Sequence, residues 1–178
     1  MQTINSREVY VNPWMRVRED SIRRQDGSDG IYGVIEKPTY ALVIPLDGDR
    51  VHLVEQFRYP LGLRRWEFPQ GTAPQRKDMA GDELAARELR EETGLRAGRM
   101  VEIGLLDAAP GMSNQRGRVF VATELTEGAH EREHEEQDMR AAWFARTEFE
   151  DMIRRGDVTD AQSIAAYTLL LLHERRAG

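Results

Sequence analysis

Three glutamates, Glu88, Glu91 and Glu92, lie within the segment RELREETGL at residues 87–95. If this segment is helical, a rotation of about 100° per residue places all three carboxylates on one side of the helix. Glu88 and Glu92 then form a like-charge pair four residues apart, which costs an isolated helix roughly 0.2–0.5 kcal/mol unless a cation lies between them. Carboxylate oxygens select Mg2+, Mn2+ or calcium over zinc or copper, so one interpretation of the spacing is a site for a hard divalent cation, commonly Mg2+.

The same spacing also fits a solvated acidic helix face. Arg87 can pair with Glu91, and Glu92 can pair with Arg96, because such pairs are common on the surfaces of helices. The spacing by itself favours this interpretation, and the surrounding sequence has to decide between the two.

The charge of the whole chain bears on this choice. Its formal net charge is −6, which argues against a general nucleic-acid binder, because such proteins neutralise phosphates with clustered lysines and arginines. An acidic protein that handles phosphates needs something to offset charge repulsion, and a divalent cation held by carboxylates does so. We therefore expect small-molecule partners and no nucleic acid.

The composition is that of one globular domain. The chain has 178 residues, of which 40% are hydrophobic and 31% charged, and it has no cysteine. No apolar run approaches the ~18 residues of a membrane span. The first ten residues lack the basic start and apolar core of a secretory signal. We expect a protein without a membrane segment that resides in the cytoplasm.

The helix that carries the glutamates is expected from about Asp82 to Glu92. Gly94 is placed to end it in a left-handed conformation, and Asp78 or Asp82 could cap its start. The preceding stretch, 58–77, is interrupted by prolines and glycines and is predicted to be a structured loop region.

Strands are expected on both sides of this helix. Residues 40–46 and 51–57 flank Asp47-Gly48-Asp49, a strong hairpin signal. Other segments with strand character are 9–17, 31–36, 101–107, 118–123 and 140–145. Two helices should follow, one opened by a capping box at Thr147–Glu150 and closed by Gly156, the other spanning 160–176 with Ile164, Thr168, Leu171 and Leu172 toward the core. This order fits an α+β sandwich with a mixed or antiparallel sheet better than a doubly wound fold.

RELREETGL also resembles, in full, the second half of the Nudix box, the signature of the Nudix hydrolases, which reads R-E-U-x-E-E-x-G-U with U aliphatic. FPQG at 68–71 resembles the entry to that helix. The resemblance implies an α/β/α sandwich with a mixed sheet, and attack of water on a phosphate of a nucleoside diphosphate linked to another group. It further implies that Glu88, Glu92 and the Gln70 carbonyl are metal ligands, that Glu91 is a ligand or supporting acid, and that Arg87 holds the glutamates by pairing.

The first half of the box departs from the pattern. Met79 stands where a glutamate is expected, and Ala73 stands where a glycine is expected. If Gly71 is the opening glycine of the box, the loop 72–86 is two residues longer than usual. The departure puts the positioning of the helix in question more than its metal ligands.

Several further segments resemble the ADP-ribose pyrophosphatase branch of the family: 54–71, 107–122 and 156–170. The resemblance implies that Arg58, Glu67 and Gly111 bind substrate. Arg64 and Arg65 could also contact phosphate, but paired arginines in a loop favour a solvated interpretation. Trp66 is interpreted as core packing over base stacking. In this branch a glutamate from a later acidic loop helps to activate water, and Glu136, then Glu135, are favoured here over Glu133. We expect residues 1–38 to form a strand extension in a homodimer interface and residues 39–178 to form the hydrolase domain.

The expected reaction is Mg2+-dependent hydrolysis of ADP-ribose or an ADP-sugar to AMP and a sugar phosphate. WEFPQG at 66–71 also resembles the Nudix enzymes that trim 5′-pyrophosphate from RNA. Hydrolysis of GDP-sugars or dinucleoside polyphosphates is another alternative. A ligand sensor without turnover is a different class, but its sign would be degenerate glutamates, and those of RELREE are intact.

Overall fold

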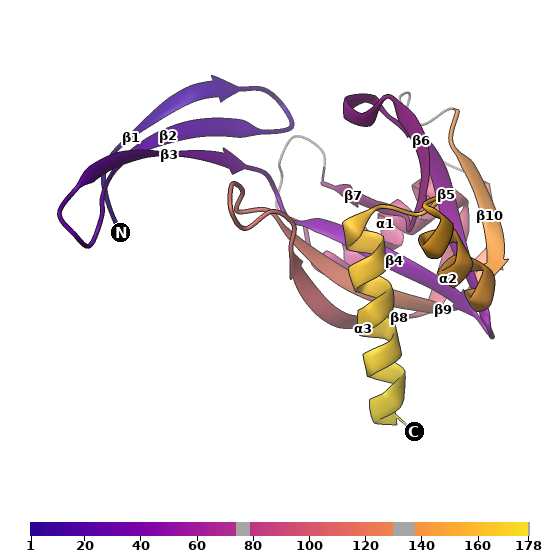
Figure 1. Ribbon diagram of the computed structural model, residues 1–178. Coiled ribbons are helices and arrows are strands. Elements are labelled where there is room, and N and C mark those ends of the chain that lie inside the picture. The colour runs from indigo at the N-terminus through magenta and orange to yellow at the C-terminus, as the bar shows by residue number, and fades with distance from the viewer. Residues whose placement is uncertain (74–78, 130–137, 178) are drawn as a thin grey trace.

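The computed structural model describes residues 1–73, 79–129 and 138–177, which form two β-sheets and three helices. Figure 1 shows a narrow N-terminal sheet that projects from a larger body, in which helices cover both faces of a second sheet. Among the described residues, no helix is long and apolar enough to span a membrane.

The projecting sheet is an antiparallel meander of β1 (Gln2–Val11), β2 (Arg16–Arg23) and β3 (Asp29–Glu36). The single strand predicted over 9–17 is wrong, because the chain turns there. The Asn12 side-chain oxygen accepts hydrogen bonds from the backbone N–H groups of Trp14 and Met15 at 2.9 and 2.8 Å. Asn12 and Pro13 are turn formers, and they divide the segment into two strands.

The larger sheet is mixed, as predicted. Its strands are β4 (Tyr40–Asp47), β5 (Arg50–Arg58), β6 (Leu63–Glu67), β7 (Gln70–Thr72), β8 (Leu95–Asp107), β9 (Arg116–Glu127) and β10 (Arg140–Ala145). The order is β10-β5-β4-β9-β8, with β6 added to β5 and β7 added to β4, and β4 runs parallel to β9. The loop predicted over 58–77 therefore contains two short strands and a 3-10 turn at Tyr59–Leu61.

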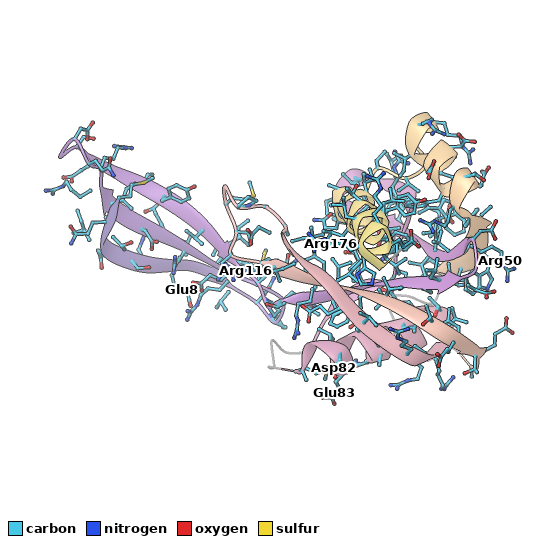
Figure 2. All side chains as sticks on the ribbon, turned by 90° about the horizontal axis from the view of Figure 1, so that it is seen from below. Glu8, Arg50, Asp82, Glu83, Arg116 and Arg176 are labelled. Carbon is cyan, nitrogen blue, oxygen red and sulfur yellow. The ribbon has the colours of Figure 1, made fainter. Side chains whose placement is uncertain are left out.

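Alternate residues of β4 face the two helical layers, since successive side chains of a strand point to opposite faces. Ala41 and Val43 pack with α1 (Gly81–Thr93) on one face. Leu42 and Ile44 belong to the core on the other face, which also contains α2 (Arg146–Arg155) and α3 (Ala161–Ala177). Figure 2 shows α1 below the sheet, with Asp82 and Glu83 pointing outward, and α3 above it. The predicted sandwich is confirmed.

The caps of two helices differ from the prediction. Gly94 ends α1 in the left-handed region (φ 74°), as expected, but Ala80 precedes its start and no side chain caps it. Asp82 lies within the first turn, and Asp78 lies outside the described residues. Gly156 closes α2 as expected (φ 83°), whereas the capping box at Thr147–Glu150 is wrong because the helix already begins at Arg146.

The buried face of α3 matches the predicted one only in part, since Ile164 and Leu171 pack against the core as expected but Thr168 and Leu172 do not. Ser163, Ala166, Tyr167 and Leu170 are buried, whereas Thr168 is exposed and Leu172 is 48% exposed. Residues 169–172 are all leucine, so apolar periodicity does not distinguish one side of the helix from the other. The buried polar residue Ser163 fixes the rotation, since its hydroxyl accepts a hydrogen bond from the Phe68 N–H at 2.9 Å.

Candidate active site

Helix α1 directs two of the three glutamates of RELREE, Glu88 and Glu92, inward. Glu88 is 6% exposed and Glu92 is 2% exposed, which excludes a solvated face as the role of these two residues. The backbone N–H of Gln70 in β7 donates to Glu92 Oε2 at 3.2 Å. A Cβ added to Gly71 would lie 2.2 Å from Glu88 Oε2, so the absence of a side chain at Gly71 lets the carboxylate lie against β7.

Glu91 has a different environment. Arg87 Nε donates to Glu91 Oε1 at 2.8 Å, an i,i+4 ion pair between side chains that are 21% and 14% exposed. The Arg87–Glu91 pair was expected of a solvated helix face, and it also places a cation beside one of the three glutamates, as the resemblance to the Nudix box implies for Arg87.

The side-chain groups that Glu88 and Glu92 offer as metal ligands fit a hard divalent cation. They are all oxygens, and burying two carboxylates so close together is costly unless positive charge or hydrogen bonds compensate. Across residues 1–73, 79–129 and 138–177, no three His, Cys, Asp or Glu side chains gather closely enough to hold a metal ion unaided. Mg2+ commonly combines one or two carboxylates with water and substrate oxygens, so the two buried carboxylates suit it.

Arg58 and Glu67 form a second polar centre at the ends of β5 and β6. Glu67 is 1% exposed and accepts hydrogen bonds from Arg58 Nε at 3.0 Å, from Arg58 Nη2, and from Gln56 Nε2 at 2.6 Å. Burial raises the pKa of Glu67, although the Arg58 charge acts in the opposite direction. Burial is the largest single influence on the pKa of Arg58 and lowers it, but the charge and hydrogen bonds of Glu67, together with the charges of Asp160 and Glu92, raise the pKa above its ordinary value. Glu67 thus fixes the orientation of the guanidinium.

Asp160, just before α3, connects that helix to β7 through hydrogen bonds. Its Oδ2 accepts hydrogen bonds from the Ser163 N–H at 2.8 Å, the Ser163 hydroxyl at 2.7 Å and Gln70 Nε2 at 3.1 Å. No site role was predicted for Asp160. The sequence signal was an aspartate three residues before a serine at a helix start, which is a capping pattern and does not indicate a ligand site.

A cavity of about 370 Å3 lies between β6 and the start of α3, and we call it the β6–α3 cavity. It is lined by Arg58, Pro60, Leu61, Arg65, Glu67, Gln70 and residues 159–162. A hollow of about 240 Å3 shares Arg58 and Gln70 with it and also includes Lys37, Tyr40, Gly71, Thr72 and Gln115. Burial and the nearby Asp160 carboxylate raise the pKa of Tyr40 to about 12, so its phenol is neutral near pH 7.

Arg64 and Arg65 were interpreted as solvated, and the structure corrects this. Arg65 lines the β6–α3 cavity, and its Nε donates to Thr159 Oγ1 at 3.1 Å. Arg64 pairs with Glu55 at 2.9 Å and with Asp138 at 2.6 Å. The two are adjacent in a strand and therefore point to opposite faces, a consequence of β6 that was missed because the segment was predicted to be a loop.

The remaining predicted residues are distributed as follows. Trp66 packs edge-on against Phe144 with ring centroids 4.9 Å apart, which confirms its core role. The Gly111 carbonyl accepts a hydrogen bond from the Tyr32 hydroxyl at 2.7 Å, so Gly111 lies against the N-terminal sheet and not in the cavity lining. Glu133, Glu135 and Glu136 lie outside the described residues.

The two departures from the Nudix box are both apolar positions in the structure. Ala73 is 4% exposed and belongs to the core beneath α1, and Met79 packs against the same core. Ala73 and Met79 are thus held by apolar packing.

Comparison with known proteins gives concordant results. A sequence model of the NUDIX domain matches residues 36–167, and one described as the nucleoside diphosphate sugar hydrolase N-terminal domain matches residues 1–35. An ADP-ribose pyrophosphatase of Mycobacterium tuberculosis is 35% identical, over 99% of this chain and 85% of the relative. An ADP-ribose pyrophosphatase of Bacillus subtilis is 25% identical, over 97% and 94%.

A solved structure titled as an ADP compounds hydrolase shares the fold. The superposition has a TM-score of 0.87 and covers 99% of this chain and 95% of the other, at 18% sequence identity. The domain match and the whole-chain relative agree with the resemblance of RELREETGL to the Nudix box. The chain therefore belongs to the Nudix hydrolase family.

Proposed function

We propose that this Nudix hydrolase cleaves the pyrophosphate bond of ADP-ribose or an ADP-sugar, giving AMP and a sugar phosphate. The observation that carries the proposal is the arrangement around Gln70. On one side lie the buried carboxylates of Glu88 and Glu92, and on the other lie Arg58 and the β6–α3 cavity. A cation site next to an arginine-lined cavity suits a pyrophosphate linked to a polar group.

Nudix hydrolases use divalent metal ions, and we infer Mg2+ for this chain, with Mn2+ as a substitute. Glu88, Glu92 and the Gln70 carbonyl would hold the ion, with Glu91 as a further ligand or supporting acid. When bound, such an ion offsets the repulsion between carboxylates and phosphates and makes a coordinated water more acidic.

The chain's own groups position the substrate for attack. Arg58 would contact a phosphate through the part of its guanidinium that Glu67 does not engage, and Arg87 would keep Glu91 in place. Glu136 or Glu135 would accept a proton from water. The water oxygen bonds to one phosphorus, the bond from that phosphorus to the bridging oxygen breaks, and the two protons of water pass to solvent as two phosphomonoesters are released.

The test is a substrate panel of ADP-ribose, other ADP-sugars, GDP-sugars, dinucleoside polyphosphates and triphosphorylated RNA, with identification of the products. We expect fastest turnover of an ADP-linked sugar, with AMP among the products. RNA as the best substrate would contradict the proposal, as would binding of nucleotides without any turnover.

We further propose a homodimer built through the N-terminal extension, residues 1–38, and a cytoplasmic location. Every residue of β1 is exposed, and large apolar side chains of the projecting sheet are exposed as well: Ile4, Val9, Tyr10, Val11, Trp14 and Ile31. An exposed strand with apolar side chains is a typical association surface. This observation supports the dimer.

A further inference from the structure

The polar groups of the β6–α3 cavity are fixed before any ligand arrives. Asp160 is held at Oδ2 by three hydrogen bonds, from two groups of Ser163 and from the Gln70 amide. Within the described part of the chain, its Oδ1 has no hydrogen-bond donor. A fixed carboxylate with one unused oxygen is an acceptor for a ligand hydroxyl or amino group.

Arg65, which also lines the cavity, is held in a comparable way. Its Nε donates to Thr159 Oγ1 at 3.1 Å, and its Nη1 donates to the Arg64 carbonyl at 3.0 Å. Its Nη2 has no acceptor among the residues that the structure describes. With Arg58, this places two guanidinium groups around a single cavity, an arrangement that favours a phosphate.

The lining disfavours a nucleobase. None of the cavity-lining residues in the described ranges is aromatic, and the apolar part consists of Pro60, Leu61 and Ala161. Sites for bases commonly use the face of an aromatic ring. A ligand with hydroxyls and a phosphate matches an acceptor and two cations better than a base does.

Gln70 connects this cavity to the proposed cation site. Its side-chain amide bonds to Asp160, and its backbone N–H bonds to Glu92. A group in the cavity is therefore next to the pyrophosphate that Glu88 and Glu92 would face. We propose that the β6–α3 cavity binds the sugar phosphate half of the substrate, an inference that rests on the proposed function. Arg58 and Arg65 would face the phosphate, and Asp160 Oδ1 would accept a hydrogen bond from a sugar hydroxyl.

The experiment separates the two halves of ADP-ribose. Ribose 5-phosphate and AMP are tested individually as inhibitors and by calorimetry, on the wild type and on Arg65→Ala and Asp160→Asn. Arg154→Ala and Asp151→Asn are matched controls, because these residues form an exposed ion pair with each other on α2, outside the cavity lining. Kinetics on ADP-ribose are measured for the same proteins across a Mg2+ titration, since Asp160 also holds Gln70.

We expect Arg65→Ala and Asp160→Asn to weaken the binding of ribose 5-phosphate at least tenfold. The same substitutions should weaken the binding of AMP less than twofold. For Arg65→Ala, KM for ADP-ribose should rise about tenfold with little change in kcat, which is the pattern for a lost binding contact. The controls should match the wild type.

Three results would overturn the inference. They are a selective loss of AMP binding, behaviour of both cavity variants like that of the controls, and no binding of ribose 5-phosphate by a wild type that binds AMP. Any of these combined with normal ADP-ribose hydrolysis would leave the proposed function intact. A wild type that hydrolyses no nucleotide of the panel would instead reject the function itself.

Discussion

At the scale of single residues, the site depends on buried carboxylates whose charge has to be compensated. Glu67 has Arg58 and Gln56 as donors, and Glu92 has the Gln70 N–H. Glu88 and Glu92 were selected from their spacing together with the resemblance of RELREETGL to the Nudix box, and Arg58 and Glu67 were selected from the resemblance to the ADP-ribose pyrophosphatase branch. Asp160 and Arg65 were not selected, because their roles arise where α3 meets β6, and a local pattern holds no information on that contact.

The raised pKa of Glu67 predicts a pH dependence of stability. Its pKa in the folded protein lies above the ordinary value of 4.5, so between these two pKa values the unfolded chain is ionised and the folded chain is not. The stabilisation by protonated Glu67 is present below about pH 4.5 and is lost as the pH rises through the folded pKa. In urea unfolding from pH 4 to 8, Glu67→Gln should remove this part of the slope. Identical slopes for wild type and variant would contradict the assignment.

At the scale of elements, the close approach of β7 to α1 positions the glutamates. The helix and its glycine end were predictable from composition and from Gly94. The β7 strand was not, because a three-residue strand between prolines has no detectable period.

Gly71→Ala tests this approach. The added Cβ would lie 2.2 Å from Glu88 Oε2, so the carboxylate must move away from β7. We expect Mn2+ affinity, measured by electron paramagnetic resonance, to fall at least tenfold. Gly33→Ala is the control, because a Cβ there meets nothing within 4 Å. Unchanged Mn2+ affinity in Gly71→Ala would show that Glu88 does not hold the ion from this position.

The corrected face of α3 makes a second prediction at this scale. Leu170 is 1% exposed and Leu172 is 48% exposed. Leu170→Ala should lower the free energy of unfolding by about 2–5 kcal/mol, whereas Leu172→Ala should cost less than about 1 kcal/mol. Denaturant unfolding of both variants measures the difference, and a larger loss at Leu172 would restore the face predicted from the sequence.

At the scale of the whole molecule, the projecting N-terminal sheet is the surface that we expect to bind a second copy of the chain. The sequence indicated strands in this region but gave neither their number nor their projection, because both depend on the turn at Asn12 and on contacts of β3 with the loop around Gly111. A three-stranded sheet with one wholly exposed strand has little core of its own.

The proposed dimer predicts a mass near twice 20.4 kDa by light scattering at micromolar concentration. Replacing Tyr10 and Trp14 together by glutamate should lower the mass toward that of the monomer, because both side chains are large, apolar and exposed. Leu172→Glu, an exposed change on α3, is the control. A monomeric wild type would reject the dimer.

The central claim is that Glu88 and Glu92 hold the divalent cation that the reaction needs. The most direct measurement is hydrolysis of ADP-ribose, or of the best substrate of the panel, by wild type, Glu88→Gln and Glu92→Gln across a Mg2+ titration, with circular dichroism to confirm folding. Glutamine keeps the shape and removes the charge. We predict folded variants that require more Mg2+ and whose turnover is lower by a factor on the order of a hundred to a thousand. Full activity of folded Glu92→Gln at ordinary Mg2+, or of the wild type in EDTA, would contradict the claim.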